Sequence, residues 1–211
     1  TTRAQLERVY DVTGMAGAAG SAGAPLNLDL HSTDWANPHA RWFRQIPVWR
    51  AVDEADVIIN LAKLKTHNLT AMTGAVKNCF GLIPSPHKAH LHMRWPRPDD
   101  FSEMLLDLCL RARPALHILD AVLGMEGDGP SAGQPRQVGA LLASTDALAL
   151  DVAMAALVGC SPTVVTTTAA GVRRGLVSGR TEDLRWVGVP LRDLKVMGFR
   201  PSSSWLANNP L

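Results

Sequence analysis

Residues 57–61 form a continuous apolar run, VIINL, and the more polar stretch AKLKTH follows directly at residues 62–67. Such a run is typical of a strand that is buried on both faces, as in a parallel sheet. A second buried strand is predicted at residues 116–120, LHILD. Helical patterns separate the two runs, so the sequence predicts an α/β fold with a layered, largely parallel sheet flanked by helices.

The remaining elements follow from apolar periodicity and from turn residues. Further strands are predicted at residues 26–30, 46–52, 138–143 and 184–187. Helices are predicted at residues 2–13, 70–80, 146–158 and 163–174, with another that begins after Asp99 or Asp100. We interpret the Gly/Ala-rich segment 16–25 and the His-rich segment 87–92 as loops. Residues 1–211 are expected to form a single α/β domain with an irregular tail at residues 190–211.

The composition excludes several classes of protein. Of the 211 residues, 46% are hydrophobic and 19% are charged, an ordinary globular balance. The net charge is only +2, so no basic field points to nucleic acid. The sequence contains no run of about 18 apolar residues, so nothing in it suggests a membrane span. The three cysteines form no CxxC motif, so we expect no iron–sulfur cluster on them; free thiols favour a cytoplasmic protein.

Basic side chains follow the first predicted strand. Lys63, Lys65 and His67 come first, and Lys77 and Asn78 follow in the next predicted helix. Ammonium groups and the free N–H groups of a helix N-terminus bind anions, and α/β sheets bind ligands beyond the carboxyl ends of strands. The sequence therefore predicts a site for an anionic small molecule. The alternative is that both lysines are solvated and His67 only caps a turn.

Three histidines occupy one short segment, at His87, His90 and His92. The segment contains no carboxylate and no cysteine, which are the usual companions of histidine in metal sites. We therefore favour a single functional histidine over a three-histidine metal site, and we choose His92 as a candidate catalytic residue.

Acidic side chains follow the second predicted strand. Asp120 ends that strand, and Glu126 lies in the glycine-rich turn behind it. They could serve as general acid and base, hold a divalent metal, or only neutralise the lysines. Asp151 interrupts an apolar helix, and a buried carboxylate needs a partner. An ion pair with a lysine is the favoured role for Asp151, and a place in the binding site is the alternative.

Two long segments resemble one protein family. Residues 55–84, ADVIINLAKLKTHNLTAMTGAVKNCFGLIP, and residues 116–159, LHILDAVLGMEGDGPSAGQPRQVGALLASTDALALDVAMAALVG, are similar to the blocks shared by the domain of unknown function 362 family. The resemblance extends over residues 1–189. The family's recurring polar positions fall here on Lys63, Lys65, His67, Lys77, Asn78, His92, Asp120, Glu126, Asp146 and Asp151.

Members of this family are often described as iron–sulfur or ferredoxin-associated proteins. Many carry ferredoxin-type cysteine motifs, which this chain does not have, so the resemblance implies that any cluster belongs to a ferredoxin-type partner. Members usually have a further α/β segment before the helix predicted at residues 2–13, and we expect this chain to lack it. No activity is securely attached to the family.

The leading hypothesis is an enzyme, with or without a redox link, that acts on an anionic small molecule. Substrate binding is assigned to Lys63, Lys65, His67, Lys77, Asn78 and Asp151, and catalysis to His92, Asp120 and Glu126. A divalent metal is compatible with the acidic residues. The alternative hypothesis is a non-catalytic accessory module that docks to a ferredoxin-type iron–sulfur protein.

Overall fold

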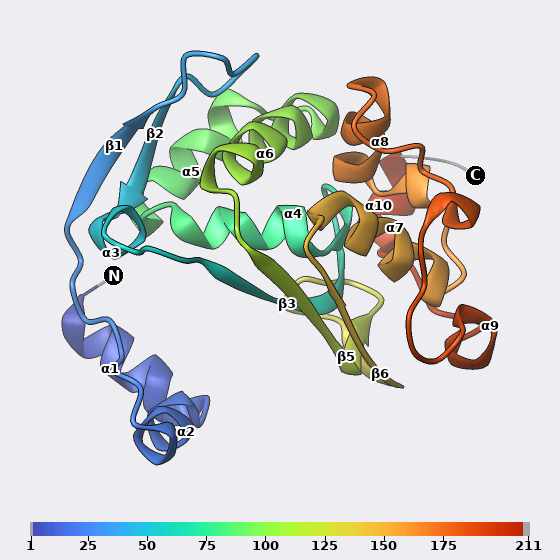
Figure 1. Ribbon diagram of the computed structural model, residues 1–211, viewed down its shortest axis with the longest axis horizontal. Coiled ribbons are helices and arrows are strands. Elements are labelled where there is room, and N and C mark those ends of the chain that lie inside the picture. The colour runs from blue at the N-terminus through green and yellow to red at the C-terminus, as the bar shows by residue number, and fades with distance from the viewer. Residues whose placement is uncertain (1, 209–211) are drawn as a thin grey trace.

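The central element of the computed structural model, which describes residues 2–208, is a four-stranded sheet (Figure 1). Its strands lie in the order β4-β3-β5-β6. Their bounds are Ile59–His67 for β3, Ala71–Thr73 for β4, Leu116–Glu126 for β5 and Gln134–Ser144 for β6. The chain is therefore a mixed α/β protein, as the sequence predicts.

The direction of the strands differs from the prediction. Only the pair β3–β5 is parallel, whereas β3–β4 and β5–β6 are antiparallel, so the sheet is mixed rather than largely parallel. Short connections explain the difference. The chain passes from β3 to β4 and from β5 to β6 through loops too short for a helical crossover, and such loops join antiparallel strands.

Five helices cover one face of this sheet (Figure 1). They are α4 (Ala75–Asn78), α5 (Ser85–Arg94), α6 (Pro98–Ala112), α7 (Ala147–Leu157) and α8 (Thr166–Arg173). Side chains along each strand point alternately toward these helices and away from them. Leu64 and Leu119 point toward the helices and are fully buried. Within residues 2–208, no helix combines the length and apolar character needed to cross a membrane.

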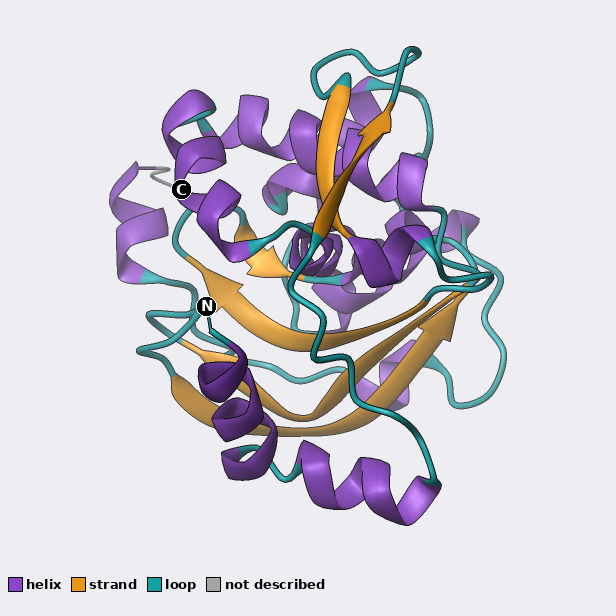
Figure 2. Cartoon of the chain, turned by 90° about the vertical axis from the view of Figure 1, so that its left-hand side faces the viewer, coloured by secondary structure: helices purple, strands orange, loops and turns teal. Residues whose placement is uncertain are grey.

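A separate two-stranded hairpin, β1 (Ser32–Ala36) and β2 (Gln45–Trp49), lies beside the helical layer (Figure 2). The carboxylate of Asp107 on α6 accepts hydrogen bonds from the backbone N–H groups of Trp42 (2.7 Å) and Phe43 (2.9 Å), which fixes the loop of the hairpin. Arg174 in turn donates to Asp107 at 2.7 Å. The hairpin is thus attached to the core through a paired, buried carboxylate.

Two helices near the N-terminus lie apart from this layer, on the opposite side of the sheet (Figure 2). They are α1 (Arg3–Val12) and α2 (Met15–Ala22), and neither contains a buried residue. The prediction of a loop at residues 16–25 is wrong for most of that segment. Alanine has the highest helix propensity, and Gly14 and Gly23, both with positive φ, set the bounds of the short helix.

The short elements complete the chain. They are α3 (Arg50–Asp53), α9 (Leu191–Leu194), α10 (Ser203–Asn208) and the 3-10 helices Cys79–Leu82, Pro162–Val164 and Thr181–Asp183. The segment expected to be an irregular tail therefore contains α9 and α10, and its last residues, 209–211, lie outside the described part. The strands predicted at residues 26–30 and 184–187 are not formed.

The second face of the sheet remains exposed, although the run at residues 57–61 predicts burial on both faces. Ile59 and Leu61 on β3 are 56% and 67% exposed, and Leu141 on β6 is 66% exposed. The run places apolar side chains on both faces of the sheet. Within residues 2–208, the helical layer covers one face, and no element buries Ile59 or Leu61 on the other. The prediction of a doubly buried strand is wrong for this part of the chain.

We expect Leu61→Ser to change the free energy of unfolding by no more than about 0.5 kcal/mol, because an exposed side chain gains little from burial. Urea denaturation measures this change. Leu64→Ala, which truncates a fully buried side chain of the same strand, is the control and should be clearly destabilising. A loss for Leu61→Ser as large as for Leu64→Ala would contradict the exposed face.

Candidate functional site

Lys77 on α4 lies against two aromatic rings of the helical layer. Its Nζ atom is 4.9 Å from the ring centroid of Phe80 and 5.5 Å from that of Phe101. The two rings contact each other edge to face, with centroids 5.4 Å apart. The turn from α4 into the following 3-10 helix brings Lys77 and Phe80 together, and α6 supplies Phe101.

Helix α5 brings two more basic side chains to the same rings. Lys88 Nζ lies 5.6 Å from the Phe80 centroid. The imidazole of His92 stacks on Phe101 with centroids 4.4 Å apart and meets Phe80 edge-on at 5.4 Å. Lys88 and His92 are four residues apart, so they share one face of the helix. The prediction that residues 87–92 form a loop is wrong; Pro86 lies in the first turn of α5, where proline is favoured.

His67, the last residue of β3, is the fourth basic group. Its Nδ1 accepts hydrogen bonds from the backbone N–H groups of Leu69 (3.0 Å) and Thr70 (3.3 Å). The neutral ring therefore carries its proton on Nε2, which forms no hydrogen bond within residues 2–208. Burial and, after it, the charges of Lys77 and His92 together lower the pKa of His67 to about 3.

These four side chains, His67, Lys77, Lys88 and His92, are named the Lys–His cluster. Burial and then the charge of Lys88 lower the pKa of Lys77 to about 8. Burial also lowers the pKa of Lys88, and burial together with Lys77 lowers that of His92. No carboxylate contributes to any of these shifts, and no member of the cluster forms an ion pair within the described residues.

Two of the predicted lysines lie elsewhere, because β3 continues through residues 59–67 instead of ending at Leu61. Lys63 donates to Asp120 at 2.7 Å, and this hydrogen bond lowers the pKa of Asp120. Asp120 lies in the middle of β5, where Lys63 is its register partner. Lys65 follows two positions later on β3 and is half-buried. The two side chains, Lys63 and Asp120, form a partly exposed ion pair apart from the cluster.

Glu126 holds the C-terminal segment. It is 5% exposed and accepts hydrogen bonds from Arg200, through Nε at 2.8 Å and through the backbone N–H at 3.2 Å. Burial alone raises the pKa of Glu126, but the hydrogen bonds from Arg200 and the charges of Arg200 and Arg136 outweigh it and lower the pKa. Glu126 therefore has a structural partner in Arg200. It forms no hydrogen bond or ion pair with His92 among the described residues.

Asn78 and Asp151 hold backbone groups. Asn78 Nδ2 donates to Asn60 Oδ1 (2.6 Å) and to the carbonyl of Leu61 (2.9 Å). Asp151 is fully buried and accepts from the backbone N–H groups of Ala75 (2.5 Å) and Val76 (3.2 Å), at the start of α4. Asp151 therefore pairs with N–H groups rather than with the lysine that the sequence suggests.

The structure thus brings together His67, Lys77 and His92 from the set predicted by sequence, and it adds Lys88. The signal for Lys88 is its spacing of four residues from His92, which a loop assignment hides. Within residues 2–208, no group of three or more His, Cys, Asp and Glu side chains is arranged to hold a metal ion. In particular, Asp120, Glu126 and His92 have separate partners.

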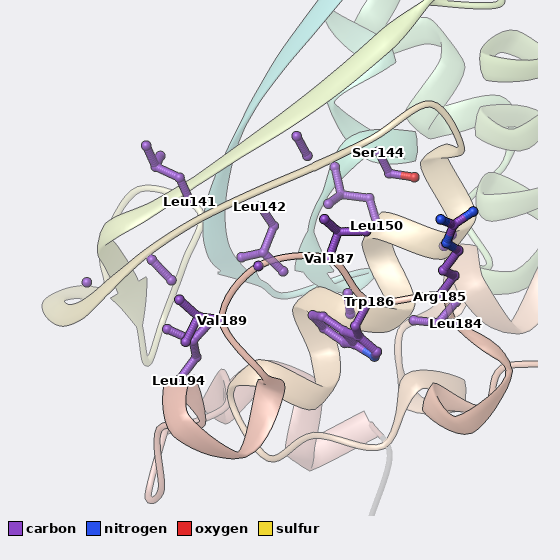
Figure 3. Close-up of a pocket in the computed structure, with 16 residues that line it drawn as sticks. Leu141, Leu142, Ser144, Leu150, Leu184, Arg185, Trp186, Val187, Val189 and Leu194 are labelled. Atoms are coloured by element: carbon purple, nitrogen blue, oxygen red, sulfur yellow. The ribbon is translucent and has the colours of Figure 1, made fainter.

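A cavity of about 510 Å³ lies at the edge strand β6 (Figure 3), and no residue of the Lys–His cluster lines it. Leu141 and Leu142 line it from β6, and Trp186 and Val187 line it from the segment before α9. Arg185 is the only lining side chain that carries a charge. Because this lining offers no acid–base pair, we place the candidate functional site at the Lys–His cluster.

Comparison with known proteins gives the class of protein. The family model described as "Domain of unknown function (DUF362)" matches residues 1–156, so the chain belongs to this family. Over 135 residues the chain is 41% identical to a thylakoid-associated protein of Synechocystis sp., a match that covers 64% of this chain and 42% of the relative. The match therefore spans less than half of the relative's length. No solved structure matches the chain.

Proposed function

We propose that this protein binds a small anionic molecule at the Lys–His cluster and acts on it as part of an enzyme. The observation that carries the proposal is the convergence of basic groups around Phe80 and Phe101 without a carboxylate partner in the described residues. Neighbouring positive charges repel and are poorly hydrated when half-buried, which is costly in the empty site. A carboxylate or phosphate between them offsets that cost.

Replacing Lys88 by alanine is expected to weaken the binding of inorganic phosphate about tenfold, because one charge-assisted contact is worth about 1.5 kcal/mol. Isothermal titration calorimetry at low ionic strength measures the change. Lys195→Ala, at an exposed position after α9, removes the same charge elsewhere and is the matched control. Equal losses in the two variants would show a general effect of charge and would contradict the site.

The accessory role beside a ferredoxin-type partner stays a prediction. Anaerobic co-purification with a ferredoxin tests it directly. The cytoplasmic location also stays a proposal, which rests on three free cysteines, two of them buried. Association with thylakoids, which the name of the Synechocystis relative states for that protein, is the alternative.

A further inference from the structure

We propose that Lys77 is a carbonyl-condensing amine whose substrate is a small 2-oxo carboxylate. This inference rests on the proposed anion site and adds a reaction to it. The amine is held over the faces of Phe80 and Phe101, and Lys88 is its cationic neighbour. A lysine becomes nucleophilic when it is desolvated or placed beside another cation. Lys77 is half-buried against two aromatic rings, and Lys88 contacts one of the same rings.

The protonation state of the amine supports this role. An ordinary lysine is almost entirely an ammonium ion at neutral pH and has no free lone pair. Burial and the charge of Lys88 lower the pKa of Lys77 to about 8, so a substantial fraction of the amine is neutral at slightly alkaline pH. No carboxylate in the described residues holds the group in its charged form.

The substrate class follows from the neighbours of Lys77. A 2-oxo carboxylate carries its carbonyl carbon next to its negative charge. Lys77 Nζ and Lys88 Nζ lie 4.9 and 5.6 Å from the centroid of the same Phe80 ring, so Lys88 can take the carboxylate, which leaves the neighbouring carbonyl for the amine of Lys77. The rings of Phe80 and Phe101 are themselves buried, so they supply apolar surroundings on one side of the amine, and the oxo acid approaches from the exposed side of Lys77.

The chemical step is balanced without an oxidant or a metal. The lone pair of the neutral amine attacks the carbonyl carbon and forms a carbon–nitrogen bond. The amine nitrogen loses two protons, the carbonyl oxygen takes up two protons, and the oxygen leaves as water when the carbon–oxygen bond breaks. The resulting imine takes one proton from solvent and becomes an iminium ion, which withdraws electrons from the neighbouring carbon.

Borohydride trapping tests the inference. Pyruvate and sodium borohydride are added to the whole chain, and peptide mass spectrometry locates reduced adducts. We expect an adduct on Lys77 that requires both reagents and that lactate, which has no carbonyl, does not form. Lys77→Arg keeps the positive charge but has no nucleophilic amine, so it should give no adduct. Lys195→Met should give the same adduct on Lys77 as the original chain.

The outcomes separate this inference from the anion site. Binding of lactate and pyruvate without an adduct would overturn the condensing role of Lys77 and leave the anion site standing. Adducts spread equally over Lys77 and the exposed Lys195 would overturn it as well, because they would show unselective chemistry. Absence of any binding would overturn the proposed function too. Circular dichroism of Lys77→Arg confirms that the variant is folded before either result is read.

Discussion

Replacing Lys77 by methionine is expected to weaken phosphate binding at pH 7 about 30-fold, the largest loss among the cluster residues. The ammonium group is half-buried against the rings of Phe80 and Phe101, so its contact with an anion is poorly screened by solvent. A charge-assisted contact of this kind is worth about 2 kcal/mol. Methionine keeps the apolar contacts with both rings and removes the charge. Isothermal titration calorimetry compares the two proteins.

The same variant should not be less stable than the original chain at pH 7. The folded state binds the proton of Lys77 less tightly than the unfolded state, because the pKa falls from 10.5 to about 8. The unfolded state therefore binds more protons between pH 8 and 10.5, and this group makes stability rise with pH over that window. Lys77→Met removes this rise. A variant that lost both stability and binding would indicate a structural role instead.

Replacing Asp151 by alanine is expected to lower the free energy of unfolding by about 3 kcal/mol. The change leaves two buried N–H groups, on Ala75 and Val76, without an acceptor and opens a small cavity. The site is closely fitted, since a Cβ on Gly74 would overlap the Asp151 carboxylate. Because these groups begin α4, the loss should also disturb the helix that carries Lys77. Urea denaturation measures the change.

The destabilisation should depend on pH in a defined direction. Burial raises the pKa of Asp151 from 3.8 to about 7, against the two N–H donors that lower it. The folded state therefore binds the proton more tightly, and the stability from this group falls as pH rises from about 4 to about 7. We expect a greater loss for Asp151→Ala at pH 5 than at pH 8. Asp151→Asn, which keeps one acceptor, should lose less; equal losses for both variants would contradict the hydrogen bonding.

Strong apolar patterns predicted the elements but not how they are connected. The runs at residues 57–61 and 116–120 lie in or beside β3 and β5, which form the parallel pair. Strand direction was missed because β4 has three residues, too few to show a period, and follows β3 through a tight turn. Helix α2 was missed because a run of Ala and Gly carries no apolar periodicity to distinguish it from a loop.

The site was predicted in part, for a related reason. Polar residues after an apolar run suggest the end of a strand, but β3 and β5 continue as far as His67 and Glu126. Alternation along the strand then separates Lys63 and Asp120 from the helical layer that carries Lys77, Lys88 and His92. Contacts between elements, such as those of Lys88 and His92 with Phe80, depend on tertiary packing that one sequence does not reveal.

Calorimetric titration with sulfate at pH 7 and at pH 9.5 tests the central claim, that the Lys–His cluster binds anions, most directly. Sulfate keeps the same charge over this range, whereas Lys77, with a pKa of about 8, loses its proton. We predict binding at pH 7 that weakens at least about fivefold at pH 9.5, and no comparable change for Lys77→Met. Absence of binding at pH 7, or the same affinity at both values, would contradict an anion site built on Lys77.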